Sequence, residues 1–299
     1  MGTVAGSSVL GMLIPPSVLF ILYGILANES IGALYIAGII PGLILTTVYI
    51  IGIILMIRFR RELITREVPS PGESDVLTMS VVTMVKKGSP IAVLVILVLG
   101  GIYIGFFTPT EAGAAGAFMV LMIGVLNRRL TLRDFWQSLL DTGYITSSIL
   151  LILVAAQIYS RMLTISTVPN FICDIGVSLS LPPILIVLFF MLVLIGMGCF
   201  LDSTSILLIA MPIMVPVVKA LGYDLIWFAI PMVLLCHIAG ISPPCGITLF
   251  VLQSLRPNRP ITEIYRGLLP FGVIIFILLG LMTAFPRVVL FLPELMMGK

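Results

Sequence analysis

The sequence has few charged residues and almost no histidine. Lys, Arg, Asp and Glu make up only 10% of its 299 residues, and there is a single histidine, His237. Because a soluble domain carries about 25% charged residues, this scarcity excludes an ordinary soluble fold. The four cysteines contain no CxxC pair and so give no sign of a zinc site or a disulfide framework. The net charge of +3 gives no sign of nucleic-acid binding, since the basic residues lie between apolar runs.

Long apolar runs are what the sequence has instead. Sixty per cent of the residues are hydrophobic, the runs are long enough for membrane helices, and strict two-residue alternation is absent. The sequence therefore predicts an all-α polytopic membrane protein in a lipid bilayer. The predicted apolar segments are 9–27, 31–57, 90–107, 110–126, 142–163, 183–201, 203–218, 225–255 and 264–292.

Lys and Arg gather in three polar connections, at residues 58–89, 127–138 and 256–266. The connections near 28–30, 108–110 and 164–182 carry none. Because basic loops stay on the cytoplasmic side of a membrane, the first three connections are expected inside and the others outside.

Asp202 lies between two apolar segments, 183–201 and 203–218, with almost no other charge nearby. Two arrangements satisfy the order of inner and outer connections. Residues 183–255 either cross the membrane three times, or form a re-entrant hairpin that turns near Asp202 and is followed by a single crossing. The hairpin is preferred because it keeps the carboxylate away from lipid.

A double proline interrupts an apolar run twice, in "GMLIPPS" at 11–17 and in "GISPPCG" at 240–246. Each is followed, after a similar spacer, by Gly-aliphatic-aliphatic-Pro, beginning at Gly38 and at Gly267. The predicted orientations of the two copies are opposite, and inverted repeats with broken helices are typical of secondary transporters. The second copy has a hairpin before its broken helix, whereas the sequence before the first is too short for one. We therefore expect an N-terminally truncated sequence, or a separate chain that supplies the missing part.

The two breaks and the hairpin turn predict a joint site for a cation and a substrate. Carbonyl groups freed by the prolines, together with hydroxyl and carboxylate oxygens, suit a hard cation such as Na⁺. The alternatives are a proline kink with a packing role and a pure N-cap role for Asp202. The predicted site residues are Pro15, Pro16, Ser17, Asp202, Ser203, Thr204, Ser205, Ser242, Pro243, Pro244 and Gly246, with Asp202, Ser203 and Ser242 as sodium ligands and Na⁺ as the coupling ion.

Two other motifs favour structural roles. Thr108, Pro109 and Glu111 have the spacing of a helix-starting capping box. His237 is interpreted as a neutral, hydrogen-bonded packing group, with a proton relay as the alternative.

The stretches "LGMLIPPSVLFILYGI", "FTPTEAGAAGA", "LDSTSILLIAMPIMVP" and "HIAGISPPCGITLF" resemble the large membrane subunit (DctM-like permease) of the tripartite ATP-independent periplasmic (TRAP) transporters. The resemblance covers essentially the whole chain. It implies an elevator-type, sodium-coupled importer of small carboxylates, such as C4-dicarboxylates or sialic acid, in a bacterial or archaeal cytoplasmic membrane. It also implies a small membrane subunit and a periplasmic substrate-binding protein as partners, and sodium sites at the hairpin tip and the double-proline loops.

The predicted organisation has four parts. Residues 1–57 form the second part of repeat 1, 58–89 a cytoplasmic linker, 90–182 the scaffold helices of repeat 2, and 183–299 its hairpin, broken helix and last membrane helix. A channel or a structural membrane subunit is the alternative function, although the apolar segments offer no continuous polar lining. An intramembrane aspartyl protease is disfavoured, because the predicted topology separates Asp202 from Asp224.

Overall fold

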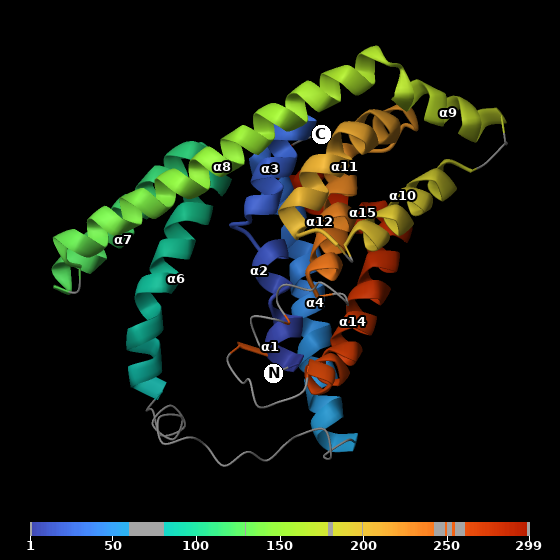
Figure 1. The fold of residues 1–299 in the computed structure, drawn as a ribbon. Coiled ribbons are helices and arrows are strands. Elements are labelled where there is room, and N and C mark those ends of the chain that lie inside the picture. The colour runs from blue at the N-terminus through green and yellow to red at the C-terminus, as the bar shows by residue number, and fades with distance from the viewer. Residues whose placement is uncertain are drawn as a thin grey trace. The chain divides into compact units, whose positions relative to one another are not determined.

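The computed structural model describes residues 2–59, 81–128, 130–178, 182–198, 200–241, 249, 253–254 and 261–297. These residues are almost entirely helical, which confirms the all-α prediction (Figure 1). The chain divides into two compact units: one is Met1–Leu55 with Ser148–Lys299, and the other is Met56–Ser147.

The first unit contains the broken helix and the hairpin. Its N-terminal helices are α1 (Gly2–Ser7), α2 (Leu10–Leu13), α3 (Val18–Ala27) and α4 (Ile31–Phe59), whose last residues belong to the second unit. After the C-terminal part of α8 (Leu132–Ile165) come α9 (Val168–Ser178), α10 (Pro183–Met197), α11 (Ser203–Ala220), α12 (Leu225–Ile241), α14 (Ile261–Ala284) and α15 (Pro286–Met297).

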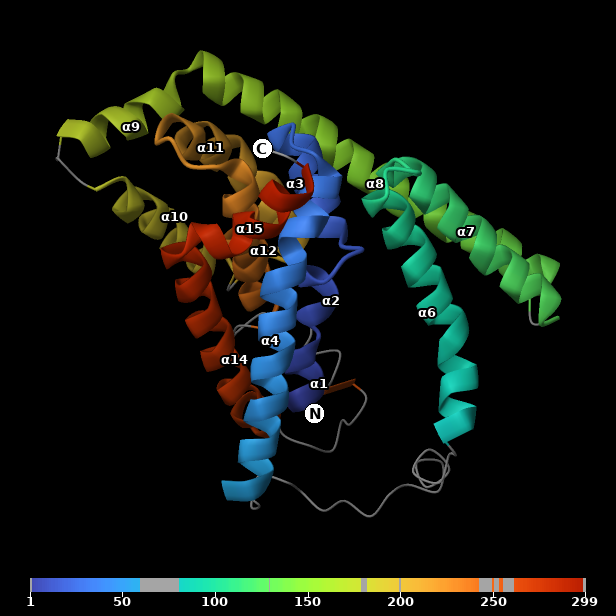
Figure 2. The ribbon, with the colours of Figure 1, turned by 180° about the vertical axis from the view of Figure 1, so that it is seen from behind.

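Helix α12 is the core of this unit. Every residue of it except Ile226 and Gly240 is buried, and it packs against α2, α3, α10, α11, α14 and α15 (Figure 2). A helix that is apolar all round must be covered on all sides, so this sequence favours a central position. Tyr23 donates to the Leu225 carbonyl oxygen at 2.6 Å, and the Trp227 indole donates to the Met282 carbonyl oxygen at 2.9 Å. These bonds fix the start of α12 against α3 and α14.

The second unit contains α6 (Val81–Tyr103), α7 (Pro109–Leu126) and the first part of α8. Helices α6 and α7 pack on each other, and Gly116 faces the Val98 side chain. The predicted capping box at the start of α7 is confirmed: the Glu111 amide donates to the Thr108 hydroxyl, and the Glu111 carboxylate accepts from the Thr108 amide at 2.8 Å.

Six helical stretches of the described residues are long and apolar enough to cross a membrane: Leu10–Ala27, Ile31–Arg58, Pro109–Leu126, Leu132–Ile165, Ser203–Ala220 and Ile264–Ala284. Three shorter apolar helices accompany them, Gly88–Tyr103, Pro183–Met197 and Leu225–Ile241. The chain is thus a multi-pass membrane protein.

Several predicted segment ends are wrong. Helix α8 begins at Leu132, inside the predicted connection 127–138, because Thr131 and Asp134 form a reciprocal cap: the Asp134 amide donates to the Thr131 hydroxyl, and the Asp134 carboxylate accepts from the Thr131 amide, both at 3.1 Å. Helix α6 begins at Val81, inside the predicted connection 58–89. Hydropathy identifies the apolar part of a membrane helix. It does not predict where a helix begins when its first turns contain polar and charged residues, as they do in α6 and α8.

Two further segments differ. The predicted outer connection 164–182 contains α9, which follows Thr167, a residue with a left-handed φ of 55° that ends α8. The predicted segment 264–292 is two helices, α14 and α15. Pro286 lacks the amide hydrogen that a continuous helix would need there, and it also disfavours helical geometry at Phe285.

Candidate functional site

The first double proline breaks a helix as predicted. Helix α2 ends at Leu13, α3 begins at Val18, and Ile14 and Ser17 both have extended backbone. Because Pro15 and Pro16 have no amide hydrogen, the carbonyl groups of Gly11 and Met12 lose the helical donors they would otherwise have four residues later. The break therefore leaves main-chain oxygens without helical donors beside a turn in which Pro15 and Ser17 are buried and Ile14 and Pro16 are exposed.

Ser17 lies at the N-cap position of α3 but does not cap it. Its side chain is only 2% exposed, and its hydroxyl has no hydrogen-bond partner among the residues that the structure describes. The Ser17 carbonyl oxygen, in contrast, accepts from the Ile21 amide at 3.3 Å and from the Tyr35 hydroxyl at 3.5 Å. A buried hydroxyl without a partner costs about 1–3 kcal/mol, so this oxygen is available to a ligand.

Two glycines of α4, Gly38 and Gly42, pack closely against the residues at the start of this break. A Cβ atom at Gly38 would lie 2.7 Å from the Leu13 carbonyl oxygen, and one at Gly42 would lie 2.7 Å from the Ile14 side chain. Only glycine admits the extended linker at this distance. The "GIIPG" element of the predicted repeat thus has a packing reason for following the double proline.

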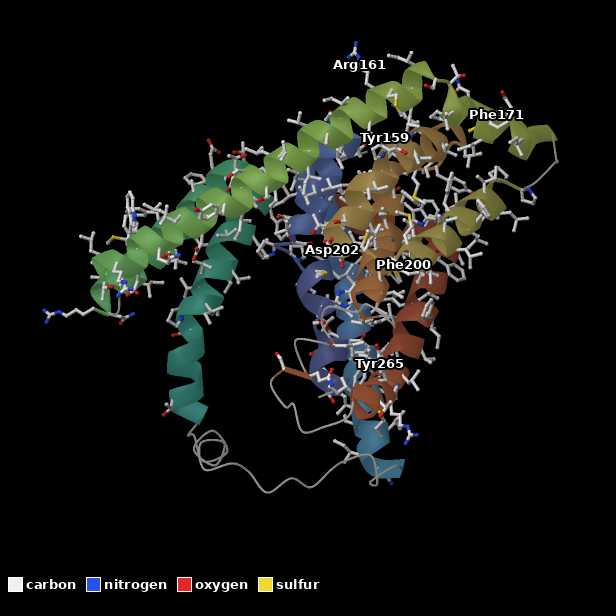
Figure 3. All side chains as sticks on the ribbon, in the orientation of Figure 1. Tyr159, Arg161, Phe171, Phe200, Asp202 and Tyr265 are labelled. Atoms are coloured by element: carbon white, nitrogen blue, oxygen red, sulfur yellow. The ribbon has the colours of Figure 1, made fainter. Side chains whose placement is uncertain are left out.

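The hairpin turn between α10 and α11 is built around Asp202 (Figure 3). Its carboxylate caps α11 by accepting from the Thr204 amide at 3.0 Å, the Ser205 amide at 3.2 Å and the Ser205 hydroxyl. Asp202 is thus the N-cap residue of α11, and this placement does not decide between a pure N-cap role and a part in the predicted cation site. Because a carboxylate has about four acceptor positions, capping does not exhaust it, and its role as a sodium ligand stays a prediction.

The hairpin tip is seated on the last two turns of α12. The Ser203 hydroxyl donates to the Cys236 carbonyl oxygen at 2.6 Å. A Cβ atom at Gly198 would lie 2.3 Å from the Ala239 Cβ, so the two backbones are as close there as glycine allows. Phe200 follows on the tip with 77% of its side chain exposed, beside Asp202 in Figure 3.

The predicted residues of the second double proline, Ser242, Pro243, Pro244 and Gly246, lie outside the described residues. Helix α12 ends at Ile241, directly before them, so the tip contacts the helical turns that lead into this motif. The structure therefore brings Asp202, Ser203, Thr204 and Ser205 to the end of α12. It buries Pro15 and Ser17 in a separate turn of the same unit.

Sequence reasoning missed two partners in this region. The Cys236 main-chain oxygen anchors the tip, and a backbone acceptor carries no sequence signal. Tyr35 faces the Ser17 carbonyl oxygen, and only its position three residues before "GIIPG" could have drawn attention to it. Within the described part of the chain, no group of three or more His, Cys, Asp or Glu side chains could hold a metal ion.

His237 is buried, with 1% of its surface exposed, and contacts Ser8 and Met12. The interpretation as a packed polar group agrees with this placement.

The apolar spans and the interrupted helix at the first double proline define a class, that of polytopic helical membrane proteins with a broken helix. Residues 1–288 match the family described as "Tripartite ATP-independent periplasmic transporter, DctM component", and the chain belongs to this family.

Three curated relatives match nearly the whole chain. The sialic acid TRAP transporter large permease protein SiaM of Vibrio cholerae is 33% identical over 99% of the chain and 68% of its own length. The C4-dicarboxylate TRAP transporter large permease protein DctM of Pseudomonas aeruginosa is 33% identical over 98% of the chain and 67% of its own length. The sialic acid TRAP transporter permease protein SiaT of Haemophilus influenzae is 28% identical, and the chain spans 47% of it. These relatives are transporter subunits, so the chain is a transporter permease and not an enzyme.

Proposed function

We propose that this chain is the permease subunit of a sodium-coupled secondary importer of small organic acids. It acts in a prokaryotic cytoplasmic membrane, together with a small membrane subunit and a periplasmic substrate-binding protein. The alternatives of a channel and of a structural subunit have no observation in their favour.

The observation that carries this proposal is the buried hydroxyl of Ser17. A polar atom buried without a partner is unfavourable unless a ligand satisfies it in another state. The neighbouring carbonyl groups of Gly11 and Met12 lack helical donors, and they add main-chain oxygens of the kind that Na⁺ binds. The Ser17 hydroxyl and the carbonyl groups of Gly11 and Met12 are thus three oxygen atoms near one extended linker, and we assign them as part of the ligand set of a small cation.

The hairpin tip offers a second set of oxygen ligands for a cation. Asp202 supplies a negative charge, and Ser203 and Thr204 follow it in the first turn of α11. Helix α10 has 15 residues, a length of about 22 Å, whereas the hydrocarbon core is about 30 Å thick. The second arm, α11, is long enough to cross a membrane, so the short α10 is what supports a re-entrant hairpin whose tip remains inside the membrane, where a carboxylate serves an ion or substrate.

The substrate class follows from the relatives and from the helix termini. The names of the three relatives specify sialic acid and C4-dicarboxylates, which are both carboxylates. The first-turn amides of α3, at Val18, Leu19 and Phe20, have no acceptor within their helix and no side-chain cap at Ser17. Such a terminus attracts an anion, which suits a carboxylate held next to Na⁺.

Sodium binding is tested on the purified chain in detergent by measuring its thermal unfolding midpoint in NaCl and in choline chloride. A ligand that binds only the folded state raises the midpoint, so Na⁺ is expected to raise it and Ser17→Ala to reduce the rise. Thr47→Val is the matched control, because its hydroxyl bonds to Leu43 within α4 on an exposed face. Equal midpoints in both salts would contradict the sodium site.

Transport is tested in proteoliposomes that contain the chain with its two partner subunits. Uptake of a labelled C4-dicarboxylate or of sialic acid is expected only with an inward Na⁺ gradient. Uptake that persists after the gradient is collapsed would support a channel instead.

A further inference from the structure

His237 is a buried polar side chain that the proposed site does not use. It lies on α12, five residues before Ser242, and its ring contacts two residues at the other end of the sequence. Nδ1 lies 3.1 Å from the Met12 sulfur, and Nε2 lies 3.5 Å from the Ser8 hydroxyl. Since a thioether can only accept, this arrangement fits a neutral ring with its proton on Nδ1 and an acceptor at Nε2.

The contact joins corresponding positions of the predicted repeat when its two copies are aligned on Gly11 and Gly240; aligned on the double prolines, the offset is 228 residues. "SVLG" at 8–11 and "HIAG" at 237–240 each precede a double-proline motif. Ser8 and His237 are 229 residues apart, and Gly11 and Gly240 are separated by the same interval. Two inverted copies of a structure can touch at equivalent positions only close to the axis that relates them. His237 thus lies where α12 contacts Ser8 and Met12, shortly before the first double proline.

The residue before His237 extends this connection to the hairpin. The Cys236 carbonyl oxygen accepts from Ser203, which directly follows Asp202. On the other side, Met12 lies in the last turn of α2, directly before the linker of Ile14–Ser17. Two consecutive residues of α12 therefore connect the tip of the hairpin to the start of the first break.

We propose that His237 is a positioning residue that holds the first double-proline break in register with the hairpin tip. It sets the affinity of the folded protein for Na⁺ without being a sodium ligand. This inference rests on the proposed sodium-coupled function. Its physical reason is that a ligand shell is effective only when neighbouring packing and hydrogen bonds fix its atoms. Without the ring, Met12 loses a polar contact and the linker that carries Ser17 can shift.

The test is a Na⁺ titration of the thermal unfolding midpoint of the full purified chain in detergent, at constant total salt with choline. His237→Phe keeps an aromatic ring of similar size and removes both polar contacts. We expect the Na⁺ concentration for half of the stabilisation to rise at least about fivefold, the lower range of coupling between sites. His237→Gln, which restores a polar atom at the end of the side chain, is expected to recover part of the loss.

Two further variants separate positioning from general stability. Met232→Leu is the matched control: it alters a buried residue of α12 at similar volume, away from the contacts with the hairpin tip and α2 that the argument uses, so its half-saturating Na⁺ concentration should equal that of the wild type. Met12→Leu removes only the sulfur contact at similar volume, and it is expected to shift the titration in the same direction as His237→Phe. A purely structural role would lower the midpoint in choline and leave the half-saturating concentration unchanged.

The outcomes are distinct. A wild-type chain that Na⁺ does not stabilise would overturn the proposed function and this inference with it. A wild-type response to Na⁺ with unchanged half-saturating concentrations in His237→Phe and Met12→Leu would overturn the inference alone. If His237→Phe does not fold, Met12→Leu decides the question in the same way, because it removes the sulfur contact of the ring and keeps the histidine.

Discussion

Replacing Gly198 with alanine should disturb the seat of the hairpin on α12. The added Cβ would lie 2.3 Å from the Ala239 Cβ and 2.6 Å from its Cα. Carbon atoms in contact are about 3.5–4.0 Å apart, so α10 or α12 must move by more than about 1 Å. Overpacking of this kind costs about 1–3 kcal/mol, and we expect a loss of that size in the free energy of unfolding.

Gly196 provides a matched control two residues earlier on α10. A Cβ atom there would have nothing within 4 Å. Gly196→Ala should therefore be neutral or should stabilise the helix by up to about 1 kcal/mol, the difference in helix propensity between the two residues. Comparing the two variants removes the general effect of adding a methyl group to this helix.

The assay is denaturant or thermal unfolding of the purified chain, combined with the Na⁺ response of the midpoint. Gly198→Ala should lower stability and weaken the response to Na⁺, because the Ser203–Cys236 bond holds the same tip. Ala239→Gly in the Gly198→Ala background removes one of the clashing atoms and should restore part of both. If Gly198→Ala behaves like Gly196→Ala, the close contact of the hairpin with α12 is wrong.

Three other predictions concern the site and its topology. Asp202→Ala should abolish Na⁺-dependent uptake while the protein remains in the membrane, as measured by transport and by quantitative blotting of membranes; unchanged uptake would contradict the assignment. Gly38→Ala should destabilise the fold by about 1–3 kcal/mol through its contact with the Leu13 carbonyl oxygen, whereas Gly11→Ala, which meets nothing within 4 Å, should not. In a background without native cysteines, Ala220→Cys should react with an impermeant thiol reagent applied outside and Asn258→Cys should not; the reverse pattern would invert the proposed topology.

The first break was predictable from the sequence because its cause is local. Two prolines remove two helical donors wherever they occur, and the helix ends at Leu13 for that reason. The Thr108 cap was predictable for the same reason. The start of α8 could have been predicted too, since Thr131 and Asp134 have the spacing of a reciprocal cap. Residues 132–138 are mostly polar, so hydropathy alone does not indicate that the helix begins there.

The seat of the hairpin could not be predicted in this way. Ser203 bonds to a main-chain oxygen, and every residue of α12 has one, so the sequence does not indicate that Cys236 is the acceptor. The contact between Gly198 and Ala239 depends on how two helices cross, which a single sequence does not specify. The contact between Ser8 and His237 joins positions 229 residues apart, and only the fold brings them together.

Ser17 and Asp202 occupy the same kind of position, the N-cap of a helix at a break, but their side chains are used differently. Asp202 accepts three hydrogen bonds from the first turn of α11, whereas the Ser17 hydroxyl has no hydrogen-bond partner among the described residues. Removing the Asp202 carboxylate should therefore lower stability in choline, because the first turn of α11 loses its cap at a cost of about 0.5–2 kcal/mol. Removing the Ser17 hydroxyl should leave stability in choline unchanged or raise it by up to about 1–3 kcal/mol, because an unsatisfied buried group disappears. It should still weaken the stabilisation by Na⁺.

The two variants together test whether the Ser17 hydroxyl is an ion ligand. If Asp202→Ala lowers stability in choline, Ser17→Ala does not, and both weaken the stabilisation by Na⁺, the Ser17 hydroxyl is a ligand of the ion and has no structural role. A loss of stability in choline from Ser17→Ala would instead mean that its hydroxyl already has a structural partner, and the cation site would have to be sought elsewhere.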